Sequence, residues 1–252
     1  MPRYWGGWSA LPTVVHAGDR GRVAYVGVVR EQLPVFPLNT VVFPGVRMPL
    51  HVFEDRYRAL VHHLLTIPDR SMRLFGIVAI REGYEVGRHG VQSVHRVGCL
   101  VQMTSVEPYE DGRFDIEVVG RQRLRLDGLD TSGSYLVGDV DLLEERTPKG
   151  RDVAHEAGRT LATFEEYRRR LSELRGGAVL DGELPRDPQY LSYSLAATCL
   201  LTLQERQSLL EADTALDRLV LLRHALVGEM RAMRAIPSLP ATEVARTGWS
   251  PN

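Results

Sequence analysis

Residues 31 to about 145 show the apolar pattern of short β-strands. Apolar runs alternate there with Gly, Pro and polar corners, and five of them carry strand signals: 72–80, 96–109, 114–120, 121–129 and 135–143. Asp111 and Gly112, between the second and third runs, form a strong hairpin signal. Several short strands with such corners predict a compact, partly closed barrel.

The stretch from residue 33 to residue 65 begins with two short apolar runs that are interrupted by proline. Its prolines are Pro34, Pro37, Pro44 and Pro49. Because proline lacks a backbone N–H donor, each one fits only where a strand begins, ends or lies at the edge of a sheet. The two runs therefore predict short strands of a small, sharply bent sheet.

The second part of the same stretch takes the period of an α-helix. Its apolar residues fall at i, i+3, i+4, i+7 and i+8, as Tyr57, Leu60, Val61, Leu64 and Leu65. Glu54 or Asp55 is placed to cap the first turn. The predicted unit is a strand, a loop, a second strand and a helix.

The period becomes helical after residues 147–152. A helix of about six turns is predicted from Asp152 onward. Start signals for further helices are Asp187 with Pro188, Thr202 with Glu205 as a capping box, and Asp213. The second part of the chain is therefore expected to form a helical bundle.

These patterns divide the chain into four predicted regions. We expect a poorly ordered extension at 1–30, a β-barrel at 31–147, a helical bundle at 148–236 and a disordered tail at 237–252. The predicted fold class is α+β, with strands first and helices after them. We also expect the barrel and the bundle to pack as separate units, joined by the long helix that begins near Asp152.

Composition narrows the possible functions without naming one. The chain has 252 residues, of which 44% are hydrophobic and 25% charged, and this is enough for a substantial core. Its formal net charge of −1 provides no overall attraction for nucleic acid or anionic membranes. No apolar run approaches the roughly 18 to 20 residues of a membrane helix, and the N-terminal segment lacks the pattern of a secretion signal. We therefore expect a cytoplasmic protein whose two cysteines, Cys99 and Cys199, are reduced and buried.

Residues for common catalytic chemistry are missing or scattered. The nearest match to a phosphate-binding loop has Ser134 where the lysine belongs. His62 and His63 are adjacent, so they lack the one-turn spacing of a zinc-binding helix. The single lysine, Lys149, is in a segment rich in Pro and Gly, where burial would not lower its pKa. We predict no catalytic residue, no cofactor and no metal.

The segment RQRLRL brings three arginines to one face of a predicted strand. Arg121, Arg123 and Arg125 share that face, because side chains alternate along a strand. Such a stripe can contact phosphates. The alternative is a half-exposed strand whose polar side lies in water, and the absence of aromatic residues from the stripe favours this alternative.

The proline-rich stretch resembles the N-terminal, substrate-binding domain of the Lon family of ATP-dependent proteases. LPVFPLNTVVFPG and PLHVFEDRYRALV are similar to the family signature L-P-x-x-P-L-x-x-x-V-x-F-P-G, with the strand and helix after it. FGIVAI, VGCLVQM, VVGRQRLRL and LTLQERQSLLEADTALDRLVLL follow in the order and spacing of the family, over about residues 33 to 236. The resemblance implies a PUA-like β pseudo-barrel with a packed helix, followed by an α-helical bundle. Because the ATPase and Ser–Lys protease modules are not found in this sequence, the chain is similar to standalone proteins of this kind in bacteria.

The resemblance implies a binding or adaptor module that recognises polypeptide without hydrolysing it. The expected partners are unfolded or client polypeptides, with a protease or chaperone as a further candidate and no membrane. The expected contact residues are Val42, Phe43, Pro44, Phe53, Arg56 and Tyr57. The alternative for Phe43, Phe53 and Tyr57 is that they belong to the barrel core.

Two other functions stay open at this point. PUA-like barrels elsewhere hold RNA, so RNA binding through Arg121, Arg123 and Arg125 is the second hypothesis, although the balanced charge does not favour nucleic acid as a partner. A hydrolase whose active site has no recognisable motif is the third.

Overall fold

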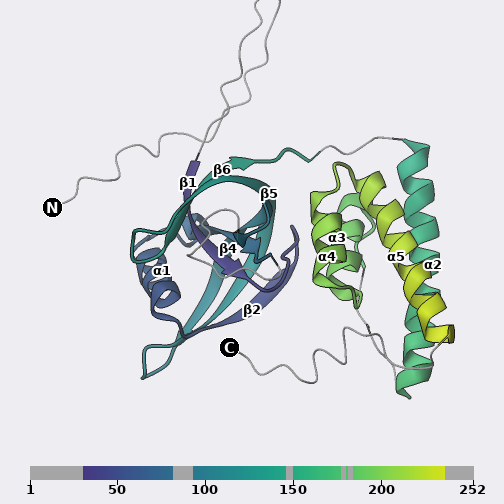
Figure 1. Cartoon of the computed structure of the whole chain (residues 1–252), viewed down its shortest axis with the longest axis horizontal. Coiled ribbons are helices and arrows are strands. Elements are labelled where there is room, and N and C mark those ends of the chain that lie inside the picture. Colours follow the sequence, from purple (N-terminus) through teal and green to yellow (C-terminus); the bar gives the residue numbers. More distant parts are fainter. Residues whose placement is uncertain (1–30, 82–92, 146–149, 177–179, 181–183, 236–252) are drawn as a thin grey trace, which may run out of the picture.

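The computed structural model describes residues 31–81, 93–145, 150–176, 180 and 184–235, and Figure 1 shows a β half beside a helical half. The strands are β1 (Glu31–Leu38), β2 (Arg47–Val52), β3 (Leu74–Ala79), β4 (Val97–Pro108), β5 (Phe114–Asp130) and β6 (Leu136–Leu142). The helices are α1 (Asp55–Leu65), α2 (Arg151–Arg175), α3 (Pro188–Thr198), α4 (Leu203–Glu211) and α5 (Ala215–Ala235), with a 3₁₀ turn at Arg70–Met72. The predicted α+β class is confirmed. The predictions for residues 1–30 and 237–252 lie outside the described residues.

The six strands form one sheet that closes on itself. Their order is β2-β5-β4-β3-β1-β6, and an additional pairing of β5 with β6 closes the barrel. Closure depends on the length of β5, whose first part pairs with β2 and whose last part pairs with β6, while β4 lies along its other edge. The two predicted strands at 114–120 and 121–129 are thus one strand of 17 residues. The predicted hairpin at Asp111 and Gly112 joins β4 to β5, and Gly112 has the positive φ of 81° that favours glycine.

Three of the four prolines lie in strands that are edges of the described sheet over part or all of their length, and Pro44 lies in the loop between β1 and β2. β1 pairs with β6 over residues 31–35 and with β3 over residues 35–38, so among the described strands most of each half has a partner on one side only. Pro34 lies in the first half and Pro37 in the second, where a missing N–H can face the unpaired side. Pro49 lies in β2, which pairs with β5 alone among the described strands. The prediction that prolines occupy edge positions is confirmed for Pro49, and its physical basis also accounts for the other two.

Helix α1 packs on the barrel with its predicted apolar face. Tyr57, Leu60, Val61 and Leu64 are buried there, in a cluster with side chains of β3, β4 and β5. Glu54 is the N-cap residue, but its side chain forms no capping bond and pairs with Arg56 instead, at 2.8 Å. The predicted helix is correct, whereas the predicted side-chain cap is wrong.

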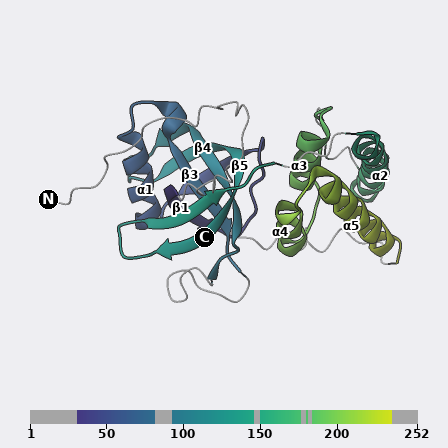
Figure 2. The same ribbon diagram turned by 90° about the horizontal axis from the view of Figure 1, so that it is seen from above.

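The helical half has two layers. α2 packs along α5, and both Figures 1 and 2 show α3 and α4 between this pair and the barrel. The predicted starts of α3 and α4 are confirmed, because Asp187 caps α3 and Thr202 forms a capping box with Glu205. The cap predicted for the last helix is wrong by one residue: Thr214 Oγ1 accepts from the N–H of Asp217, at 3.1 Å.

The barrel and the bundle share a core. Val41, Phe43 and Ala79 of the β half belong to the same buried cluster as helical residues such as Tyr193 and Leu222. The rings of Phe43 and Tyr193 are 6.0 Å apart between centroids. The expectation of two separately packed units is therefore wrong, because the loop after β1 inserts its apolar side chains between the two halves.

Candidate functional site

Three of the six expected contact residues lie in the interior of the β half or at its junction with the bundle. Val42, Phe43 and Pro44 are buried, and Phe43 is 0% exposed. Their loop crosses β5 at Gly120, where an added Cβ would lie 2.1 Å from the carbonyl oxygen of Phe43. Gly45 donates to Gly120 O at 2.9 Å and holds the loop in place. These side chains are closed off from a solvent-borne polypeptide, so we assign them to the core.

Tyr57 is also a core residue. Its ring stacks on Phe36, with centroids 3.8 Å apart, and its hydroxyl donates to the carbonyl of Pro37 at 3.4 Å. Burial raises the pKa of this phenol to about 12. Tyr57 therefore packs α1 onto the barrel and does not act as a surface contact.

Phe53 and Arg56 are the expected contact residues that reach solvent. Phe53 is 38% exposed at the end of β2. Arg56 lies at the start of α1, where Glu54 pairs with it and its guanidinium lies 4.6 Å from the centroid of the Tyr57 ring. Both side chains are held by the junction between β2 and α1, which presents them on the surface.

Two aromatic residues beside or near Phe53, His51 and Tyr109, were not expected from the sequence. The ring of His51 lies 6.1 Å from that of Phe53 and 5.9 Å from that of Tyr109, which is 42% exposed. We call His51, Phe53 and Tyr109 the aromatic patch. His51 reaches it because it lies opposite Asp115 in the β2–β5 register, and Tyr109 because it follows β4 in the hairpin.

Asp115 holds two of the three members of the aromatic patch. Its carboxylate accepts from the hydroxyl of Tyr109 at 2.5 Å and lies 2.6 Å from Nδ1 of His51. The hydrogen bond to Asp115 raises the pKa of Tyr109, and it lowers the pKa of the carboxyl group. Arg113 stacks at 5.5 Å from the centroid of the Tyr109 ring. The patch is thus a set of exposed rings in a fixed arrangement, which lowers the entropic cost of ordering them on binding.

The predicted arginine stripe is not a continuous surface. A register shift in the β4–β5 pairing leaves Arg121 out of the ladder, and it bonds to Gln102 instead. Arg125 pairs with Asp141 at 2.5 Å. Arg123 is only 4% exposed, because the corner between α4 and α5 covers it. The interpretation of Arg123 as a phosphate contact is therefore wrong.

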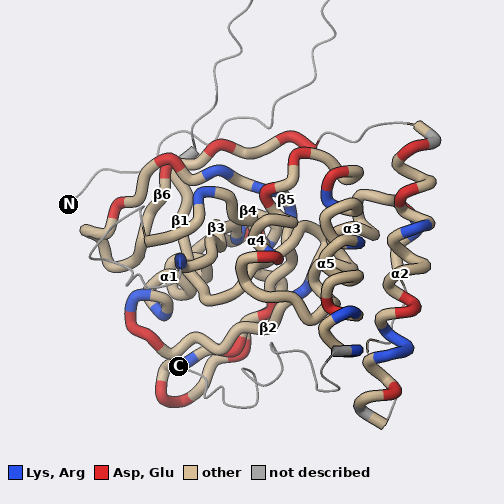
Figure 3. Tube along the Cα trace, turned by 45° about the vertical axis from the view of Figure 1, so that its right-hand side comes forward, with Lys and Arg blue, Asp and Glu red and all other residues tan. Residues whose placement is uncertain are grey.

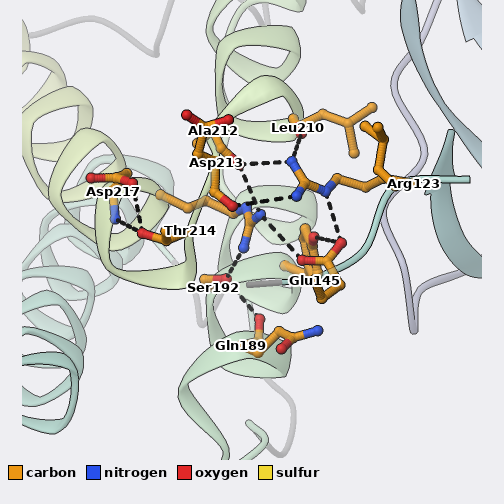
Figure 4. A network of polar contacts seen from close by, with 12 residues as sticks. Arg123, Glu145, Gln189, Ser192, Leu210, Ala212, Asp213, Thr214 and Asp217 are labelled. Atoms are coloured by element: carbon orange, nitrogen blue, oxygen red, sulfur yellow. Dashed lines mark hydrogen bonds and ion pairs between the residues drawn. The ribbon is translucent and has the colours of Figure 1, made fainter. Parts of the chain in front are cut away.

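Arg123 belongs to a buried polar network between the two halves, which Figure 4 shows. Its Nε donates to Glu145 at 2.7 Å, and its Nη1 donates to the carbonyls of Leu210 and Ala212 at 3.0 and 2.7 Å. These carbonyls end α4 and lack partners within the helix. Arg218, which is fully buried, donates to Ser192 and to α4 carbonyls.

Glu145 is the carboxylate of this network. Besides Arg123, it accepts from the hydroxyl of Tyr193 at 2.7 Å and lies 3.9 Å from a guanidinium nitrogen of Arg218. Arg218 lies 3.9 Å from the centroid of the Tyr193 ring, as a cation–π contact. These groups hold the barrel on the bundle.

The described residues contain no obvious catalytic or metal centre. Cys99 and Cys199 are buried, and burial raises the pKa of both thiols, that of Cys99 to about 12. Within the described ranges, no group of three or more His, Cys, Asp or Glu side chains is arranged to hold a metal ion. None of the helices in the same ranges combines the length and the apolar character needed to cross a bilayer. Figure 3 shows basic and acidic positions interspersed along both halves.

The fold defines a class of protein: a closed β-barrel capped by one helix and joined to a helical bundle. Residues 32–228 match the family model of the ATP-dependent protease La (LON) substrate-binding domain, so the chain belongs to this family. The Lon protease of Porphyromonas gingivalis is 25% identical over 84% of this chain, and Lon protease 2 of Syntrophobacter fumaroxidans is 28% identical over 72% of it. The chain spans 25% and 22%, respectively, of the length of these two relatives.

Solved structures show the same fold. The Lon N-terminal domain protein from Xanthomonas campestris superposes with a TM-score of 0.51 at 22% identity, over 83% of this chain and 99% of that one. The N-terminal domain of Mycobacterium avium complex Lon protease superposes with a TM-score of 0.58 at 18% identity, over 78% and 98%. The match to known Lon proteins therefore lies in the substrate-binding region.

Proposed function

We propose that this chain binds segments of unfolded or client polypeptide at the aromatic patch, without hydrolysing them. The observation that carries the proposal is the exposure of Phe53 and Tyr109 on either side of His51, with Asp115 holding His51 and Tyr109. Exposed rings with fixed geometry provide apolar contact area together with polar edges, which suits peptide recognition. Membership of a substrate-binding family supports the same proposal.

The neighbourhood of the patch suits an extended chain. β2 is paired on one side only among the described strands, and its outer edge carries Pro49 between Arg47 and His51. An edge interrupted by proline cannot extend a regular ladder, so a bound segment would rely on side-chain contacts rather than on strand addition. We therefore expect binding that prefers apolar and aromatic residues and tolerates many sequences.

The proposal includes a cytoplasmic adaptor role. In that role the chain would hold a client and present it to a protease or chaperone. The buried thiols, whose pKa values are raised, agree with a role that involves no covalent chemistry. RNA binding is not favoured, because Arg123 is buried and Arg121 and Arg125 have protein partners.

Fluorescence anisotropy with a labelled, permanently unfolded polypeptide tests the proposal. The double variant Phe53→Ser, Tyr109→Ser should bind about tenfold more weakly or worse, since each exposed ring contributes on the order of 1 kcal/mol. Leu221→Ser is the matched control, because Leu221 is 44% exposed on α5 and distant in sequence from the patch. Mass spectrometry of the recovered polypeptide should show it uncleaved. No binding by the parent protein, or equal loss in the control, would contradict the proposal.

A further inference from the structure

His51 of the aromatic patch has a charged partner at each of its two ring nitrogens. Its Nδ1 lies 2.6 Å from the carboxylate of Asp115, and its Nε2 lies 3.3 Å from Nη1 of Arg113. A neutral imidazole donates from one nitrogen and accepts at the other. Because a guanidinium only donates and an ionised carboxylate only accepts, this geometry fits the neutral tautomer that carries its proton on Nδ1.

Arg113 links His51 to the ring of Tyr109. Its guanidinium lies over that ring, 5.5 Å from the centroid, while it donates to His51. It also pairs with Asp111 of the hairpin at 2.7 Å, and hydrogen bonds from the backbone and the side chain of Arg113 lower the pKa of this carboxyl group. Since the guanidinium lies over one of the exposed rings of the patch, it competes there with a side chain of a bound polypeptide.

The groups that face His51 from the neighbouring strands do not titrate together with a histidine. Hydrogen bonds from Tyr109 and His51 lower the pKa of Asp115, so its carboxylate stays ionised. The hydrogen bond to Asp115 raises the pKa of Tyr109, so its hydroxyl keeps its proton. Glu107 lies opposite Asp115 in the β4–β5 register and adds a further carboxylate. Because histidine is the side-chain type whose charge changes between about pH 5 and 8, His51 is the member of this set that can respond to pH there.

We propose that protonation of His51 opens the aromatic patch to polypeptide. The inference rests on the proposed function, since it describes the regulation of the same site. Neutral His51 holds Arg113 over the ring of Tyr109. A protonated imidazole donates from both nitrogens, so its Nε2 repels the guanidinium, which keeps its pairing with Asp111 and leaves the ring. The ring face then becomes available to an apolar side chain of the ligand, while Asp115 continues to hold both His51 and Tyr109.

Peptide binding by the full chain at two pH values tests this regulation. The probe is a blocked peptide of Gly, Ser and Gln with one central Phe, which has no titrating group, and it carries a dye whose emission does not depend on pH. Its affinity should be about threefold higher at about pH 5.5 than at about pH 8, as expected when one aromatic face is freed from a surface cation. Circular dichroism at both pH values verifies that the protein stays folded.

Two variants separate the roles of His51 and Arg113. His51→Gln has no titrating ring and should lose the pH response, whereas His224→Gln, at an exposed position of α5, should keep it. Arg113→Ala removes the cation from the patch, so at both pH values it should bind as tightly as the parent does at the lower one. Arg231→Ala, also at an exposed position of α5, is the matched control and should behave as the parent.

NMR of the intact protein follows the same change without a ligand. As the pH falls, the Nε–Hε resonance of Arg113 and the ring resonances of Tyr109 should shift with the midpoint of the His51 ring. Resonances of Arg113 and Tyr109 that do not follow His51, or equal affinity of the parent at the two pH values, would overturn the regulation and leave the proposed function standing. Absence of binding at both pH values would overturn the proposed function and, with it, the regulation.

Discussion

At its bundle-facing end the barrel buries charged groups, whereas around α1 it leaves aromatic and apolar groups accessible. Arg123 and Arg218 are almost completely enclosed, while Phe53 and Tyr109 are about two-fifths exposed. This reverses the usual distribution, in which arginine lies at the surface and phenylalanine in the core. The contrast teaches that residue type alone does not tell which end of the barrel meets the bundle and which end remains available for a partner.

Burial of the two arginines is tolerated because every side of their charge has a partner. Their donors meet the terminal carbonyls of α4, the carboxylate of Glu145 and the ring of Tyr193. Such a network gives specificity of docking more readily than net stability, because desolvation offsets most of the attraction. The aromatic patch has the opposite balance: Asp115 holds His51 and Tyr109, and the rings of Phe53 and Tyr109 stay about two-fifths exposed.

The largest expected effect follows from removing the carboxylate of the buried network. Glu145→Ala would leave two enclosed guanidinium groups without their counter-charge, so we expect a loss of about 3–5 kcal/mol in the free energy of unfolding. Urea denaturation measures it. Glu173→Ala is the control, since Glu173 pairs with Arg169 on the exposed face of α2 and its loss should be below about 0.5 kcal/mol. Similar losses in the two variants would show that the network does not couple the halves.

The next effect compares two phenylalanines from the same stretch of sequence. Phe43→Ala should destabilise the protein by about 3 kcal/mol, because it leaves a cavity in the core shared by the two halves. Phe53→Ala should change stability by less than about 0.5 kcal/mol, because the ring is exposed. The midpoint of thermal or urea unfolding measures both. A large loss from Phe53→Ala would place that ring in the core and remove it from the aromatic patch.

Local features of the fold were predictable, because neighbouring residues determine them. The Asp111–Gly112 hairpin, the apolar face of α1 and the capping box at Thr202 depend on side chains within a few positions of one another. The start of α5 was misplaced by one residue, since Asp213 and Thr214 are both good caps and only tertiary packing selects between them.

The candidate site was only partly predictable. The alternation of side chains along a strand correctly places Arg123 on one face of β5, but it does not reveal that the end of α4 covers this face. The hydrogen bonds from Arg123 to that region join residues 87 to 90 positions apart in the sequence. The burial of Phe43 likewise depends on a loop that crosses Gly120. His51 and Tyr109 meet only through strand register, so no spacing along the chain identifies them.

The smallest expected effect concerns the pH dependence of stability at the contact between the barrel and α4. His95 lies 3.7 Å from Glu211 of α4, and burial lowers its pKa, partly opposed by Glu211 and reinforced by Arg81. The folded protein therefore binds the His95 proton less tightly than the unfolded chain does. The contribution of neutral His95 to the free energy of unfolding is fully present above the ordinary pKa of about 6.5, and it is lost as the pH falls below that value. His95→Gln should flatten this part of the pH profile of unfolding, whereas His224→Gln, at an exposed position of α5, should retain the profile of the parent. An unchanged profile in His95→Gln would mean that protonation of His95 does not affect the contact between the barrel and α4. The bundle-facing end of the barrel would then be held by the arginine network and Phe43 alone, without a contribution from this histidine.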